Sequence, residues 1–225
     1  MTKGAIELSD KPTGYYENVR REMLKYIPQG TKTTLEFGCG NGSFSELIKN
    51  EYRAECWGVE AHTYYSKIAC EKLYKVIDKD VLQALNEIPE NYFDCIIFND
   101  VLEHLPDPYS LLRDVKSKLN KRGVVVASIP NVRFWSNLKA LVIHGTWDYK
   151  DTGILDKTHL RFFTYNSLIK IFRQLDYDIV AIEGLHPTHS TTFKILNTLL
   201  FNKLKDARYR QFACVLKPES DSADV

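Results

Sequence analysis

Short apolar runs alternate with segments of helical spacing over the first 130 residues, and this alternation constrains the fold more than any other feature. Runs 33–37, 55–59, 93–98 and 124–129 are predicted to be buried strands, and amphipathic segments separate them. Strands that alternate with helices predict a parallel sheet with helices on both faces. The sequence therefore indicates an α/β fold, and the absence of any evident linker or repeat predicts a single domain, 1–225.

Composition narrows the classes of function. The 30 lysine and arginine residues nearly balance the 29 acidic residues, which makes nucleic acid an unlikely partner by charge alone. The five cysteines form no CxxC pair and are expected to be reduced thiols. No apolar run approaches the roughly 20 residues of a membrane span, and the first residues do not resemble a signal peptide. We expect a cytoplasmic protein without a membrane span.

Several polar or glycine-rich positions directly follow the predicted strands. Ligands of parallel α/β sheets bind beyond the carboxyl ends of the strands, so these positions are expected to share one edge of the sheet. They are Gly38 to Gly42, Glu60, Asp80, Asn99 to His104, and Asn131.

The glycine-rich turn GCGNG, residues 38–42, lets a ligand lie against bare backbone. No Lys-Ser/Thr pair follows it, which excludes a triphosphate loop, and Ser43 stands where a dinucleotide site has Gly or Ala. Glu36 would repel a pyrophosphate but suits a ligand with an ammonium group and a positive sulfur. Glu60, about twenty residues after the turn, can accept both hydroxyls of a ribose.

At this point the chain resembles the class I S-adenosylmethionine-dependent methyltransferases. The matching motifs occur in the family's order and cover residues 15–130: LEFGCGNG, Glu60 after Gly-Val, Asp80 before Val81, FDCIIFNDVLEHL and GVVVASIPN. The resemblance implies a Rossmann-like sheet of seven strands, mostly parallel, whose last strand (210–217) is antiparallel. It further implies a cofactor-binding core over 15–130, with acceptor-recognition elements and a lid over 131–209.

The resemblance also implies which residues bind the cofactor S-adenosyl-L-methionine. The three glycines approach its methionine moiety, Glu60 approaches the ribose, and Asp80 and Val81 approach the adenine. The implied cofactor-binding set is Tyr15, Glu36, Gly38, Gly40, Gly42, Glu60, Ala61, Asp80, Val81 and Asn99.

Two carboxylates and an imidazole follow the strand 93–98. If the chain turns helical after Asp100, then Asp100, Glu103 and His104 share a face, and such ligands suit Mg²⁺, Mn²⁺ or Zn²⁺. This D-x-x-E-H resembles the E-x-x-E-H of ubiquinone-pathway O-methyltransferases and small-RNA terminal 2′-O-methyltransferases, which hold a divalent ion there. By that resemblance His159 is the candidate for a further ligand.

Other interpretations of these residues stay open. His104 or His159 can act as a general base without a metal, or both can be structural. Arg161 suits a phosphate or carboxylate of an acceptor, whereas Phe162 and Phe163 are expected to plug the core. The apolar segment 191–204 is expected to be a helix packed on the core, with a lid, a homodimer contact or a membrane contact as alternatives.

We therefore expect an enzyme that methylates a hydroxyl of a small polar acceptor, such as a sugar or polysaccharide precursor. The segment DTGILDKTHLRFFT resembles part of bacterial methyltransferases of surface-polysaccharide pathways. One rival is methylation of a nitrogen, or of a phenol or quinone precursor, on the same fold. A rival of another class is a non-catalytic S-adenosylmethionine-binding regulatory module.

Overall fold

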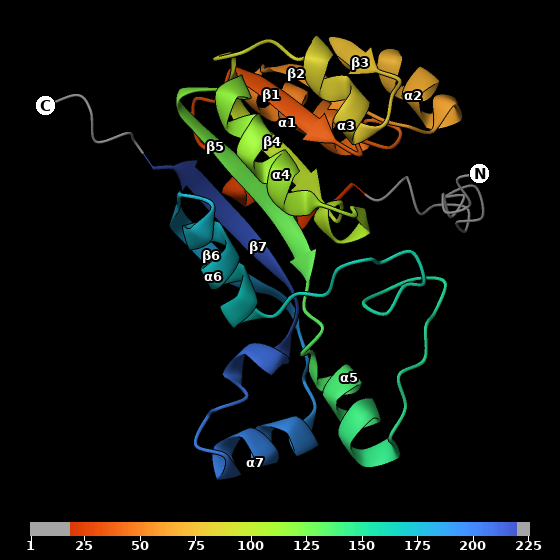
Figure 1. Ribbon diagram of the computed structural model, residues 1–225, viewed down its shortest axis with the longest axis vertical. Helices are drawn as coiled ribbons and strands as arrows, with labels where there is room; N and C mark the ends of the chain where they lie inside the picture. The colour runs from red at the N-terminus through yellow and green to blue at the C-terminus, as the bar shows by residue number, and fades with distance from the viewer. Residues whose placement is uncertain (1–18, 220–225) are drawn as a thin grey trace, which may run out of the picture. The chain divides into compact units, whose positions relative to one another are not determined.

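The computed structural model describes residues 19–219, so the predicted cofactor-binding residue Tyr15 lies outside the described residues. Seven strands form one sheet in the order β3-β2-β1-β4-β5-β7-β6 (Figure 1). The strands are β1 Thr33–Phe37, β2 Glu55–Val59, β3 Lys75–Ile77, β4 Phe93–Asn99, β5 Leu119–Pro130, β6 Tyr177–Pro187 and β7 Tyr209–Pro218.

The direction of the strands confirms the predicted sheet. Strand β1 pairs in parallel with β2 and β4, and β2 pairs in parallel with β3. The last strand in the chain, β7, lies between β5 and β6 and is antiparallel to β6. The fold is therefore the mostly parallel seven-stranded sheet with an antiparallel last strand that the sequence led us to expect.

Helical segments separate most of the strands. The α-helices are α1 Ser43–Tyr52, α2 Thr63–Cys70, α3 Val81–Ala84, α4 Pro108–Asp114, α5 Trp135–Lys139, α6 Tyr165–Gln174 and α7 Thr191–Leu199. Short 3₁₀ turns are η3 Arg21–Tyr26, η4 Leu85–Glu87, η5 Leu102–His104, η6 Val115–Lys118 and η8 Lys205–Arg208, and η7 Ala140–His144 is a π-helical turn. Within residues 19–219 none of these helices has the length and apolarity needed to cross a membrane.

The described chain divides into two compact units. The first comprises residues up to Asn99 together with Ser110–Val125. Its core forms where β1 and β4 run side by side, since Phe37 and Phe98 stack with ring centroids 5.0 Å apart and planes 4° from parallel. Residues 34–37 of β1 and 95–98 of β4 are all buried, as expected for strands that are covered on both faces.

The second unit comprises Asp100–Tyr109 and the chain from Val126 onward. Its strands β6 and β7 pair over their whole length, and α6 packs against β6 (Figure 1). Helix α6 is capped by Thr164, whose side chain accepts the backbone N–H of Ser167.

Helices α5 and α7 form a smaller apolar cluster in the second unit. Trp135 of α5 packs on Phe193 of α7, with ring centroids 5.7 Å apart, and Ala207 is buried with them. The helix predicted over 191–204 packs on these apolar neighbours as α7, but it ends at Leu199, and Leu200 and Phe201 after it are exposed. Residues 131–134 before α5 form a turn, in which the buried Asn131 amide donates to the backbone oxygens of Asp206 and Tyr209.

Candidate active site

The carboxyl ends of three parallel strands in the first unit meet at one edge. Phe37 of β1 pairs with Val59 of β2 on one side and with Phe98 of β4 on the other. Gly38, Glu60 and Asn99 therefore follow at the same level, as the sequence pattern predicted.

The glycine turn after β1 is built from left-handed backbone. Gly38, Gly40 and Gly42 have φ values of 64°, 54° and 76°, a region that favours glycine because a side chain would be strained there. A Cβ on Gly42 would also lie 3.2 Å from the Cα of Ala69 in α2. The turn thus exposes backbone to a ligand while α1 starts in close contact with α2.

Glu60 is tied to this turn by its carboxylate. The backbone N–H of Gly40 donates to Oε2 at 2.8 Å, and that of His62 donates to Oε1 at 2.9 Å. Burial raises the pKa of Glu60, and the two backbone donors partly oppose that rise. Each carboxylate oxygen has a further lone pair, so Glu60 can still accept two hydroxyl groups of a ligand.

Glu36 lies buried beneath the turn. Its oxygens accept hydrogen bonds from Ser45 Oγ at 2.7 Å and Asn99 Nδ2 at 3.0 Å, and burial raises its pKa to about 7. Asn99 Oδ1 is buried without a hydrogen-bond partner among residues 19–219. A buried acceptor without a donor is costly, and a ligand ammonium would supply the missing donor. The residues at this edge therefore fit the amino-acid and ribose groups of S-adenosylmethionine.

Of the two residues predicted to approach an adenine, Asp80 and Val81, the first also caps a helix. Asp80 is exposed and caps α3, because its Oδ1 accepts the backbone N–H of Leu82 at 3.0 Å. Val81 beside it is buried, whereas Ala61, which follows Glu60, is exposed.

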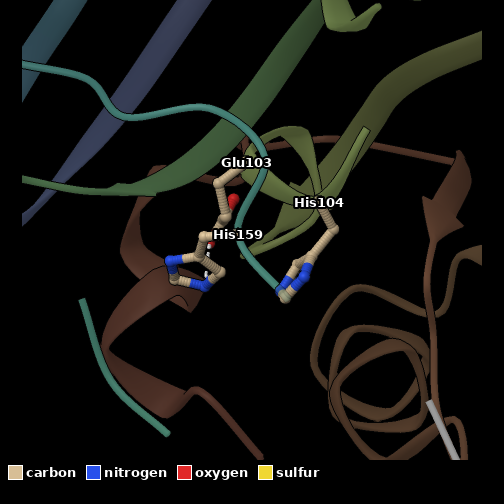
Figure 2. A group of neighbouring side chains, drawn as sticks. All are labelled: Glu103, His104 and His159. Carbon is tan, nitrogen blue, oxygen red and sulfur yellow. Dashed lines mark ion pairs between the residues drawn. The ribbon is translucent and has the colours of Figure 1, made fainter. Parts of the chain in front are cut away.

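A second group of polar side chains lies within the second unit. Glu103 and His104 come from η5, and His159 comes from the loop before α6 (Figure 2). One ligand atom from each lies within 4.8 Å of the others, and Glu103 and His159 are buried. Nε2 of His159 lies 3.9 Å from Oε1 of Glu103, and the two imidazole rings meet edge to face with centroids 4.6 Å apart. We call these three residues the EHH cluster.

Backbone carbonyls fix the state of both imidazoles. His159 Nδ1 lies 2.9 Å from the carbonyl oxygen of Ile154, and His104 Nδ1 lies 3.2 Å from that of Thr158. A carbonyl only accepts hydrogen bonds, so Nδ1 carries the hydrogen in each ring. In the neutral form of each ring the lone pair therefore lies on Nε2, which is the form that a metal ligand or a base needs.

The loop before α6 is hydrogen-bonded to η5, between residues 57 and 58 positions apart in the chain. The backbone N–H groups of Leu160 and Arg161 donate to the Glu103 carbonyl at 2.8 and 3.0 Å. Thr158 Oγ1 in turn donates to Asp156 Oδ1 at 2.8 Å, and both residues are buried. Sequence reasoning did not single out Thr158 or Asp156, whose only signal is their place beside His159.

Asp100 does not join the EHH cluster. The expected helical face shared by positions 100, 103 and 104 is wrong, because Asp100 is left-handed (φ 55°) and η5 begins only at Leu102. The Asp100 Oδ1 instead accepts hydrogen bonds from Ser128 Oγ at 3.0 Å and Gln211 Nε2 at 2.8 Å. The loop carboxylate is thus used to join β5 and β7.

The remaining loop residues divide between core and surface. The Arg161 guanidinium donates to the Pro106 carbonyl. Phe163 is buried, as expected for a core plug, whereas Phe162 is half-buried and packs edge-on against Trp147 at 5.7 Å.

Comparison with known proteins identifies the family and the fold. Residues 13–182 match the model of the family described as "Methyltransferase domain". A crystal structure of an S-adenosylmethionine-dependent methyltransferase from Archaeoglobus fulgidus covers 90% of this chain and 94% of its own, with a TM-score of 0.67 and 24% identity. That likeness shows the fold.

Two curated relatives carry names of specific reactions. The ubiquinone biosynthesis O-methyltransferase of Histophilus somni is 30% identical over 153 residues, which span 60% of this chain and 62% of that protein. Phosphoethanolamine N-methyltransferase 2 of Caenorhabditis elegans is 24% identical over 125 residues, which span 52% of this chain and 28% of that protein. The match thus spans less than two thirds of either relative.

Proposed function

We propose that this chain, which belongs to the methyltransferase domain family and is an S-adenosylmethionine-dependent methyltransferase, methylates a hydroxyl group. The proposed acceptor is a small polar molecule, such as a sugar or polysaccharide precursor. The observation that carries the hydroxyl assignment is the EHH cluster. A hydroxyl must lose its proton as the new O–C bond forms, and a neutral imidazole whose Nδ1 carries the hydrogen can take that proton on Nε2.

We propose that the glycine turn and its neighbours hold the cofactor, which supplies an electrophilic methyl group when bound. Glu60 would accept the ribose hydroxyls, and Glu36 with Asn99 would face the methionine end. The glycines would leave room for the ligand backbone to approach. Tyr15, Ala61, Asp80 and Val81 complete the proposed set.

The proton of the acceptor hydroxyl passes to Nε2 of His159 or His104. Nδ1 of either ring is already protonated and bonded to a carbonyl, so the imidazolium that forms has its orientation fixed in advance. The buried Glu103 carboxylate, 3.9 Å from His159 Nε2, stabilises that positive charge.

We further propose that Glu103, His104 and His159 can hold a divalent ion. Two imidazoles and one carboxylate suit Zn²⁺ or Mn²⁺ better than Mg²⁺, which prefers oxygen ligands. Such an ion would lower the pKa of a bound hydroxyl and so assist the same loss of a proton. Asp100 is left out of this proposal because its carboxylate is bonded to Ser128 and Gln211.

Paired variants test the ion. Calorimetry with Mn²⁺ and Zn²⁺ should show one site in the natural protein and binding weakened about a hundredfold in Glu103→Gln, in line with the loss of a charged ligand. Asp100→Asn, which preserves the left-handed turn, should bind as the natural protein does. Full methyl transfer in the presence of EDTA would contradict an essential ion and leave the histidines as bases.

A second candidate follows from the names of the relatives, which favour a phenolic acceptor of ubiquinone synthesis. An acceptor panel with radiolabelled S-adenosylmethionine separates the candidates: a nucleotide sugar, a catechol and phosphoethanolamine. We expect label in the sugar. Label in the catechol or the amine alone would overturn the sugar assignment, and cofactor binding without any transfer would support a regulatory module.

A further inference from the structure

A cavity of about 640 Å³ lies in the second unit, away from the EHH cluster's own side chains. Four segments that are distant in the sequence form its wall: the start of α5 at Ser136 and Asn137, the loop around Lys150, the end of β6 at His186, and the start of β7 at Arg210. His189 adds a second imidazole, and within residues 19–219 no Asp or Glu lines this cavity. A volume of this size is typical of small-molecule sites, which span roughly 300–1,000 Å³.

The two permanent cations of the cavity, Lys150 and Arg210, have exposed side chains on a hydrogen-bonded backbone. A Cβ on Gly153, whose φ is 93°, would lie 3.4 Å from Nη2 of Arg210, so the guanidinium rests over a bare Cα. The Lys150 N–H donates to the Leu155 carbonyl at 2.8 Å, and the Lys157 N–H donates to the Lys150 carbonyl at 2.8 Å. The backbone of Lys150 is therefore fixed on both sides of its side chain.

These cations also differ from their neighbours in the same unit. Arg133 pairs with Asp206, and Lys157 pairs with Asp151. Lys150 and Arg210 form no ion pair with any residue from 19 to 219. Two positive charges at one cavity repel each other, and an anion between them would offset that repulsion.

We propose that this cavity binds a phosphate ester and that the ester is part of the methyl acceptor. Arg210 offers a planar fork of N–H donors, Lys150 an ammonium, and His186 and His189 ring N–H groups. That number of donors matches the three terminal oxygens of a phosphate better than the two of a carboxylate. The cavity is larger than a phosphate alone needs, and Ser136 and Asn137 on its wall suit the hydroxyls of a sugar.

The cavity is connected to the EHH cluster through one residue. Ile154 lines the cavity, and its carbonyl accepts the Nδ1 hydrogen of His159. An anion seated between Lys150 and Arg210 therefore orders the loop that holds this imidazole. The identification of the ester as the acceptor rests on the proposed function, whereas phosphate binding itself does not.

Calorimetry at low ionic strength tests the binding without turnover. The probes are inorganic diphosphate, UDP-glucose and glucuronate, the last a sugar with a carboxylate in place of phosphate. We expect both phosphates to bind more tightly than glucuronate. Arg210→Gln and Lys150→Gln should each weaken the binding of UDP-glucose by at least about tenfold, since a charge-assisted contact is lost.

Arg173→Gln on α6 and Lys139→Gln on α5 are matched controls, because both side chains are exposed and neither lines the cavity. Equal binding by Arg210→Gln and Arg173→Gln, or a preference for glucuronate, would overturn the proposal. If diphosphate and UDP-glucose do not bind, but the protein binds phosphatidylglycerol vesicles with the same dependence on Arg210, the phosphate belongs to a lipid. UDP-glucose that binds without being methylated would contradict the proposed function alone.

Discussion

The glycine turn of the first unit and the EHH cluster of the second are built in opposite ways. At the turn, the backbone N–H groups of Gly40 and His62 donate to the Glu60 carboxylate, and all three residues lie within 23 positions of the chain. In the EHH cluster, side chains 55 positions apart are held by a loop whose amides bond to the Glu103 carbonyl. The first arrangement follows from local motifs, and the second exists only once the loop is folded.

This difference implies that the two groups of residues serve different steps, and variants can test that separation. Residues at the turn should govern cofactor affinity, and residues of the EHH cluster should govern turnover. The largest effect is expected for the histidines.

Replacing His159 or His104 by alanine should lower kcat by about a thousandfold, within the range that general acid–base groups contribute. The affinity for S-adenosylhomocysteine should stay unchanged, because neither ring belongs to the proposed cofactor set. Steady-state kinetics and calorimetry measure the two quantities, with His144→Ala, on an exposed residue, as the control. A near-natural kcat would assign both rings to structure.

Glu36→Gln should change how stability depends on pH. The pKa of Glu36 rises from 4.5 unfolded to about 7 folded, so the folded state binds the proton more tightly. Its contribution to stability is fully present below pH 4.5 and is lost as pH rises to about 7, by about 3 kcal/mol.

Urea unfolding at pH 4.5, 6 and 8 measures the contribution of Glu36 to stability, as the difference in the free energy of unfolding between the natural protein and Glu36→Gln. The amide cannot titrate, and Asn99 can turn its free Oδ1 toward the new Nε2 donor. Parallel pH curves for the two proteins would contradict the raised pKa of the buried Glu36.

Glu60→Ala should weaken the binding of S-adenosylhomocysteine by about a hundredfold, since two hydroxyl hydrogen bonds to a charged group are lost. Calorimetry gives the affinity, and Glu71→Ala, at an exposed position after α2, is the control. Glu60→Gln keeps one acceptor oxygen and should fall between the two. Unchanged affinity in Glu60→Ala would remove Glu60 from the ribose assignment.

The smallest effect is expected at Asp80. Asp80→Ala removes the cap of α3 and should cost about 1 kcal/mol of stability, whereas Asp80→Asn keeps a capping oxygen and should cost little. Thermal unfolding separates the variants. If Asp80→Asn nevertheless binds S-adenosylhomocysteine several-fold more weakly, the carboxylate contacts the adenine; equal affinity would restrict Asp80 to the cap.

The sheet and the edge that carries the glycine turn could be predicted because they depend on local signals. Buried strands 33–37 and 93–98 alternate with helices, and glycines with positive φ mark the turn, so the order of the first four parallel strands follows from general rules. The inserted strand β7 was expected only by family resemblance, since nothing in residues 209–218 shows where a last strand pairs.

The EHH cluster was predicted in part. Glu103 and His104 stand in one motif, but the place of His159 depends on loop hydrogen bonds to the Glu103 carbonyl that no spacing rule reveals. Asp100 was misplaced because a helical face was assumed across a residue that adopts φ 55°. Tertiary partners, here Ser128 and Gln211, decided its orientation.

The most direct measurement is a crystal structure of the protein with S-adenosylhomocysteine. We expect the ribose hydroxyls of this ligand within hydrogen-bond distance of the Glu60 carboxylate, and its amino-acid end against residues 38–42. A ribose bound elsewhere, with Glu60 still holding only the N–H groups of Gly40 and His62, would contradict it.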